Sequence, residues 1–183
     1  MKYAIQLAQW IDAKLVFFHS TNIPLKASLY GATKVEMAKL KRQDEEEKTM
    51  QLRELLSRLF AKLEIPLDKN NVVPVVESGT LIVEDIIAAG RKHKADMIVT
   101  GTHGATGINR LFGSNTSLLI SKSNIPVMAI PPRYRFRKLK NILYATDLMN
   151  PMAELKKIIP LAAAFGAAID VFNLSYTAGL HEE

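Results

Sequence analysis

A cluster of glycines in the middle of the chain has the residue types and spacing of an anion-binding loop. The glycines are Gly101, Gly104, Gly107 and Gly113. They follow the apolar run 97–99 and precede a helix-like stretch at 116–123, which is the order strand, loop, helix. Glycine lets the backbone approach a ligand closely, and unpaired N–H groups at the start of a helix attract negative charge. The sequence therefore predicts a ligand site within residues 96–117.

The elements that must position this loop alternate between helices and strands. Apolar residues recur at helical spacing in 3–13, 34–64, 81–93, 115–123 and 152–165, and short apolar or β-branched runs lie at 15–18, 72–76, 97–100, 125–130, 141–147 and 169–174. This alternation predicts an α/β fold, an open parallel sheet with helices on both faces. Ligands of such sheets bind beyond the carboxyl ends of the strands. The glycine loop and His19-Ser20 both lie at such ends.

Composition excludes several classes of protein. No apolar run reaches the ~18 residues that a membrane span needs. The absence of cysteine excludes disulfides and thiolate metal ligands. The first residues carry Asp12 and Lys14 inside an apolar stretch, which is not typical of a signal peptide. We therefore expect a cytoplasmic protein with no membrane partner and no metal site of its own.

The net charge of +6 is concentrated in one place, because five basic residues lie within the eight positions 133–140. Such a cluster could bind nucleic acid, or it could be a solvated connector. It is short and no nucleic-acid-reading motif accompanies it. We interpret it as a basic linker and expect no nucleic-acid partner.

The two ends of the chain resemble each other at an offset of 154 positions. The matching pairs are Leu7 and Leu161, Ala8 and Ala162, Ala13 and Ala167, Leu15 and Ile169, and Phe18 and Phe172. At this offset the strand at 141–147 has its counterpart before residue 1. We therefore expect a first unit at 1–132 that lacks its first strand, a linker at 133–140, and the strand–helix–strand start of a second unit at 141–183.

Several of these segments resemble the universal stress protein family. The most specific are ADMIVTGTHGATG with the GSNTS after it, NIPVMAIP, LVFFHS, and NILYATDL at the start of the second unit. The chain is identified as a tandem-type member that lacks the first strand of its first unit and most of its second unit. The resemblance implies an adenine-nucleotide α-hydrolase-like sheet of five parallel strands in the order 3-2-1-4-5. Family members are often dimers; many bind ATP and others do not.

The family's ATP-binding pattern implies a role for each of nine residues, with ATP and Mg²⁺ as the expected ligands. Gly101 and Gly104 would lie along the triphosphate and ribose, with His103 near the phosphates. Phosphates would be bound at the helix start by Gly113, Ser114, Asn115 and Thr116. Ser20, beside His19, would border the adenine through backbone groups, and Asp147 would contact the ribose or base. For Asp147 the alternative is a turn or cap residue before the next helix.

The spacing of the glycines departs from the family pattern and leaves two hypotheses open. Eight residues separate Gly104 from Gly113, where the pattern has nine. One missing residue shifts Gly113 and its successors by ~3.5 Å in extended chain or ~100° on a helix. The first hypothesis is a stress-response protein that binds ATP or a related adenine nucleotide. The alternative is a module that binds no nucleotide and acts through dimerisation and protein contacts.

The missing first strand would lie in the centre of the predicted sheet and leave two unpaired edges. Each unmatched buried backbone group costs about 1–3 kcal/mol. Residues 141–148 could fill this gap, although the helix at 152–165 would then compete with residues 3–13 for space. We therefore predict a homodimer with strand exchange, or domain swap, through 141–148. The other explanation is a chain that is part of a longer tandem protein.

Catalytic signatures are missing from the sequence. There is no G-x-x-x-x-G-K-[ST], no G-x-S-x-G and no H-E-x-x-H. An enzyme of the related α-hydrolase kind should carry an SGGxDS-type loop after the first strand, and NILYATDLMN does not. We expect a regulatory protein with no catalytic residues and at most slow, incidental ATP hydrolysis.

Overall fold

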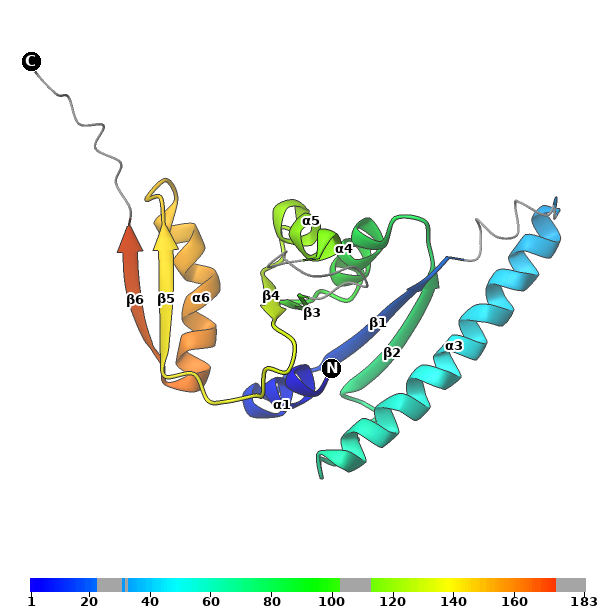
Figure 1. The fold of residues 1–183 in the computed structure, drawn as a ribbon, viewed down its shortest axis with the longest axis horizontal. Helices are drawn as coiled ribbons and strands as arrows, with labels where there is room; N and C mark the ends of the chain where they lie inside the picture. The colour runs from blue at the N-terminus through cyan, green and yellow to red at the C-terminus, as the bar shows by residue number, and fades with distance from the viewer. Residues whose placement is uncertain (23–30, 32, 103–112, 174–183) are drawn as a thin grey trace, which may run out of the picture. The chain divides into compact units, whose positions relative to one another are not determined.

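The computed structural model describes residues 1–22, 31, 33–102 and 113–173, which belong to two compact units, Met1–Arg135 and Phe136–Glu183. The elements of the first unit are α1 (Lys2–Ile11), β1 (Leu15–Thr21), α3 (Lys34–Lys62), β2 (Val72–Ser78), α4 (Ile82–Lys92), β3 (Ile98–Gly101), α5 (Ser114–Lys122) and β4 (Val127–Ile130) (Figure 1). Those of the second unit are β5 (Asn141–Thr146), α6 (Pro151–Phe165) and β6 (Ala168–Asn173). The predicted α/β class is confirmed.

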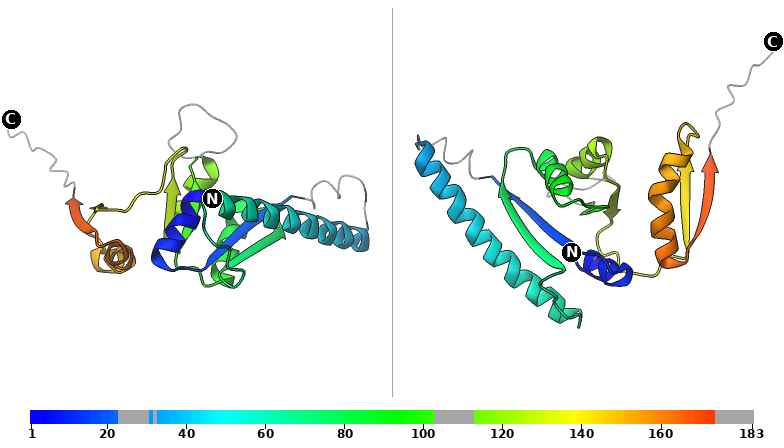
Figure 2. Two further views of the ribbon diagram at one scale, coloured as in Figure 1. Left: turned by 90° about the horizontal axis from the view of Figure 1, so that it is seen from below. Right: turned by 180° about the vertical axis from the view of Figure 1, so that it is seen from behind.

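The longest helix, α3, begins and ends at clear sequence signals. The Thr33 hydroxyl accepts from the Glu36 N–H at 3.3 Å, and the Glu36 carboxylate accepts from the Thr33 N–H at 2.9 Å, which is a capping box. Pro66 lies soon after the last helical residue. Only Leu56 and Phe60 are buried, and both belong to the C-terminal half of the helix. Figures 1 and 2 show α3 lying along β2.

Two apolar clusters form the core of the first unit. One joins α1, β1, α3 and β2 through Ile5, Phe17, Leu56, Phe60 and Val72. The other joins α4 to α5 through Val83, Ile87 and Leu119, with Ile98 and Val127 packed against it from β3 and β4. The second cluster therefore fixes the helix after the glycine loop against the strand before it.

All described strand pairs are parallel, and they form three two-stranded ladders. These are β1–β2, β3–β4 and β5–β6. In the predicted order 3-2-1-4-5, the first two ladders correspond to the two sides of the sheet, 3-2 and 4-5. No described strand is hydrogen-bonded between β1 and β3. The described residues thus form the two flanks of the expected sheet instead of one continuous sheet.

The internal repeat extends to the backbone of the two units. Asp12 ends α1 in the left-handed region (φ 51°, ψ 48°), and Gly166 ends α6 there (φ 62°, ψ 37°). The Ala13 N–H donates to the Ala8 carbonyl at 2.9 Å, and the same bond joins Ala167 to Ala162 at 2.9 Å. Each of these first-unit residues matches its counterpart at the offset of 154. β6 is therefore the counterpart of β1.

Candidate functional site

Hydrogen bonds close the base of the glycine loop. The Thr102 N–H donates to the Ile130 carbonyl at 3.0 Å, and the Gly113 N–H donates to the Thr102 carbonyl at 2.8 Å. The Thr116 hydroxyl donates to the Gly101 carbonyl at 2.9 Å. Thr102 and Thr116 are each only 5% exposed, so these bonds are shielded from water. These bonds therefore hold the two ends of the loop together, where β3 ends and α5 begins.

The start of α5 has backbone donors that no acceptor inside the helix can satisfy. Gly113 is the N-cap and has no side chain to accept from the first turn, and the Ser117 N–H donates to the Gly113 carbonyl at 3.0 Å. The N–H groups before Ser117 have no acceptor within the helix. Ser114 and Asn115 are both exposed, and the first turn holds no acidic residue. This helix start is suited to an anion.

The structure brings together five of the predicted phosphate-site residues. Gly101, Gly113, Ser114, Asn115 and Thr116 all belong to this closed loop base and the first turn of α5. Two further predicted residues, His103 and Gly104, lie outside the described residues.

A second group of residues lies at the carboxyl ends of β1 and β2. The Ser20 hydroxyl donates to Asp85 Oδ2 at 3.2 Å, from β1 to the first turn of α4. The Thr21 hydroxyl donates to Ser78 Oγ at 3.1 Å, and the Gly79 N–H donates to the Thr21 carbonyl at 3.0 Å. The predicted adenine-side residue, Ser20, is therefore held by α4, next to a residue that is bonded to β2.

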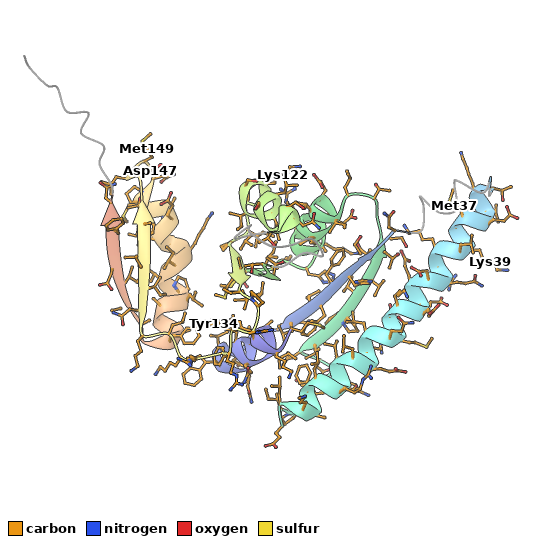
Figure 3. The ribbon with its side chains drawn as sticks, in the orientation of Figure 1. Met37, Lys39, Lys122, Tyr134, Asp147 and Met149 are labelled. Atoms are coloured by element: carbon orange, nitrogen blue, oxygen red, sulfur yellow. The ribbon has the colours of Figure 1, made fainter. Side chains whose placement is uncertain are left out.

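The first turn of α4 links both flanks of the fold. Asp85 accepts from β1 through Ser20, while the preceding Glu84 pairs with Lys122 of α5 at 2.6 Å. Lys122 is labelled in Figure 3. The hydrogen bond from Lys122 holds the pKa of Glu84 below its ordinary value. Two adjacent acidic residues thus tie α4 to the β1–β2 ladder and to the helix that carries the phosphate-site residues.

Asp147 belongs to the second unit and lies in the turn between β5 and α6 (Figure 3). Its Oδ1 accepts from the Met149 N–H at 2.9 Å, and the intervening Leu148 has a positive φ of 63°. Asn150, not Asp147, is the N-cap of α6. The structure therefore gives Asp147 a turn-forming role, and its contact with ribose stays a prediction.

A family model described as the universal stress protein family matches residues 1–131. The chain belongs to the universal stress protein family. Among solved structures, it is 21% identical to the hypothetical protein MJ0577, solved as a test case of structural genomics, with a TM-score of 0.48 over 72% of this chain and 89% of that one. It is 16% identical to the hypothetical protein PH0823, with a TM-score of 0.49 over 74% of this chain and 91% of that one. A comparison with curated proteins gives no match.

In this universal stress protein, three residues to which no sequence motif gave a role also shape the candidate site. Asp85 holds Ser20, and Thr102 closes the glycine loop. Gly79 makes room for Asp85, because a Cβ there would lie 1.8 Å from Asp85 Oδ2. The sequence signal for the Gly79–Asp85 contact is a glycine that directly follows a strand and an acidic residue in the first turn of the next helix.

Among the described residues, the side chains form no metal site and the helices no membrane span. No group of three or more His, Cys, Asp or Glu residues there could hold a metal ion. Within the same ranges, no helix has both the length and the apolar character to cross a membrane.

Proposed function

We propose that this protein binds ATP or a related adenine nucleotide together with Mg²⁺, and acts as a cytoplasmic stress-response regulator rather than as an enzyme. The observation that carries the proposal is the closed base of the glycine loop. There, Gly101 and the first turn of α5 meet through the buried hydroxyl of Thr116.

The phosphates would lie against the start of α5. The backbone N–H groups of Ser114, Asn115 and Thr116 would donate to phosphate oxygens, with the Ser114 hydroxyl and the Asn115 amide as further donors. The Thr116 hydroxyl is already engaged by the Gly101 carbonyl, so Thr116 would contribute its N–H alone. The adenine would lie at the end of β1, against backbone groups of His19 and Ser20.

A regulatory role is supported by the surroundings of the same residues. The first turn of α5, which carries Ser114, holds no acidic residue that could act as a base for its hydroxyl. A serine nucleophile needs an adjacent base to be activated. We propose that nucleotide binding alters the state of the protein and that any ATP hydrolysis is slow and incidental.

Gly101→Ala tests the nucleotide site without disturbing the fold. A Cβ at Gly101 would meet no protein atom within 4 Å, but it would occupy the space through which a ligand approaches the backbone. We expect calorimetric titration of ATP with Mg²⁺ to show binding to the natural protein and a loss of roughly tenfold or more in the variant. Ser121→Ala, at the far end of α5, should bind as the natural protein does. The proposal fails if the natural protein binds no adenine nucleotide at millimolar concentration.

A second candidate function, as a dimerisation module, is favoured by the unpaired edge of β1. Successive residues of a parallel strand direct their backbone groups to opposite edges. The Leu15 N–H and the Thr21 carbonyl both bond toward β2, at 2.7 and 3.0 Å. Val16, Phe18 and Ser20 therefore direct their backbone groups to the other edge, with which no described strand pairs.

β5 has a similar free edge in the second unit. The Ala168 N–H donates to the Lys140 carbonyl at 2.9 Å, so the even-numbered residues of β5 face β6. Leu143 then directs its N–H to the opposite edge, and its side chain is 68% exposed. We propose that this edge of β5 pairs with the free edge of β1 in a second copy of the chain, which joins strands of similar length, six and seven residues.

Leu143→Pro tests this dimer because proline removes the N–H on the free edge and leaves the edge that faces β6 intact. We expect light scattering to show a dimer for the natural chain and a monomer for the variant. Leu143→Ala keeps the N–H and should remain dimeric. A dimeric Leu143→Pro protein would contradict pairing through this edge.

A further inference from the structure

We propose that residues 133–140 bind single-stranded nucleic acid, mainly through its phosphate backbone. This role is separate from the nucleotide site and does not depend on it. In the sequence alone, the segment can equally be interpreted as a solvated connector. The structure favours a binding role through four side chains, which form a basic strip: Arg133, Arg135, Arg137 and Lys140.

The positive charge of the chain is concentrated around the basic strip. Residues 97–146 contain seven Lys or Arg residues and no Asp or Glu, so they hold more positive charge than the net +6 of the whole chain. Five of the seven lie in 133–140. The first acidic residue after the strip is Asp147. A long stretch of one sign of charge raises the local concentration of ligands of the opposite sign.

The side chains of the basic strip are exposed and have no acidic partner. All four residues are exposed to solvent. The ion pairs among the described residues all use other basic side chains. An arginine that is not engaged by a carboxylate can form two parallel hydrogen bonds to one phosphate. The strip is therefore available to neutralise phosphates, which would release their bound counterions.

Aromatic contacts hold the segment that carries the strip. Tyr134, which is labelled in Figure 3, packs against Tyr3 of α1 with ring centroids 5.9 Å apart. Two positions later, Phe136 packs against Phe165 of α6 with ring centroids 6.1 Å apart. Each contact lies within one unit and fixes the chain on that unit. A segment that is ordered before it binds loses less conformational entropy when a ligand arrives.

The chemistry of the segment favours a single strand over other polyanions. Tyr134 is 50% exposed although it contacts Tyr3, so an unpaired base can stack on its ring. A duplex is read by a helix or a strand ribbon that enters a groove, and residues 134–140 form neither. A membrane surface requires apolar side chains that can insert, whereas Phe136 is half-buried against Phe165. We therefore expect binding to single strands with little sequence preference.

The test measures the binding of a labelled uridine oligonucleotide of about twelve nucleotides, by fluorescence anisotropy over a range of salt concentrations. The natural chain should bind, with an affinity that falls as salt is added. Arg135→Gln and Arg137→Gln in one chain should reduce the affinity roughly tenfold or more at about 50 mM salt and lower the salt slope by about 1.4. Lys34→Gln and Lys39→Gln remove the same charge from exposed positions of α3 and should leave the affinity unchanged.

Tyr134→Leu tests whether a base stacks beside the strip. Leucine keeps an apolar contact with Tyr3 but offers no aromatic face, so the affinity should fall roughly fivefold or more while the salt slope stays the same. A duplex of the same length, and vesicles that contain phosphatidylserine, should bind more weakly than the single strand.

Four results would overturn this inference. They are no binding of the oligonucleotide by the natural chain, an equal loss in the lysine and arginine variants, an unchanged affinity in Tyr134→Leu, and duplex or vesicle binding as tight as that of the single strand. Each of them leaves the proposed nucleotide site standing. Thermal unfolding shows whether each variant keeps its fold; the exposed arginine pair decides if Tyr134→Leu unfolds.

Discussion

The helix–strand pair α1–β1 and its repeat α6–β6 have the same local structure but very different burial. Both helices end in the left-handed region, with the same hydrogen bond after the last turn. Ile5 is 0% exposed, while Ile159, at the same repeat position, is 51% exposed. Phe17 is 9% exposed and its counterpart Val171 is 60% exposed.

The difference shows that the partners of a helix–strand pair, not the pair itself, decide which residues become core. In the first unit, Leu56 and Phe60 of α3 and Val72 of β2 cover Ile5 and Phe17. The described residues of the second unit include no counterpart of α3 or β2. Its uncovered apolar residues support the proposed pairing with a second copy.

The largest predicted effect separates the two repeats directly. Ile5→Ala should lower the free energy of unfolding by about 2–5 kcal/mol, because it leaves a cavity in a closed core. Ile159→Ala should cost about 0.5 kcal/mol or less, because the side chain is already half exposed. Denaturant unfolding of the two variants measures the difference. Equal losses would mean that Ile159 is covered in solution, as it could be in a dimer.

A smaller effect concerns the stability of the second unit at alkaline pH. The core of the second unit contains Tyr144, whose hydroxyl donates to Glu154. Burial, and then this bond, raise the pKa of Tyr144 above 10.0. The unfolded chain ionises first, so the stabilisation is present below pH 10 and is lost as the pH rises through the raised pKa. In the first unit, burial raises the pKa of Tyr3 as well, so an alkaline loss of stability from that unit remains when Tyr144 is replaced.

Tyr144→Phe tests the contribution of Tyr144, because phenylalanine does not ionise. Circular dichroism of the natural chain should show the second unit melting at lower temperature above pH 10. In the variant this alkaline loss should be weaker. The same alkaline loss in both proteins would place its origin elsewhere.

The smallest predicted effect concerns the link from α4 to α5 in the first unit. The bond from Lys122 lowers the pKa of Glu84, so the stabilisation is present above pH 4.5 and is lost as the pH falls below that value. Both side chains are exposed, so the effect is screened by solvent. Glu84→Gln should slightly reduce the melting temperature at pH 7 and make no difference at pH 3. Glu54→Gln, at an exposed position of α3, provides a control.

Much of the candidate site could be predicted because its signals are local. The glycines and the Gly113-Ser114 pair mark a loop before a helix, and the structure places Gly101, Gly113 and Thr116 at one loop base. Asp85 could not be predicted as a partner of Ser20. The two residues lie 65 positions apart, and their contact exists only because α4 packs beside β1.

The sequence by itself determined the order of helices and strands, the family, the glycine loop and the repeat. Periodicity, glycine spacing and capping residues act over a few neighbouring positions, and so they can be seen without a structure. The tertiary structure alone decided that Ile5 is core and Ile159 is not, which edges of β1 and β5 stay unpaired among the described strands, and which acceptor orients Ser20. These properties depend on which distant segments pack together, and identical local patterns can receive different partners.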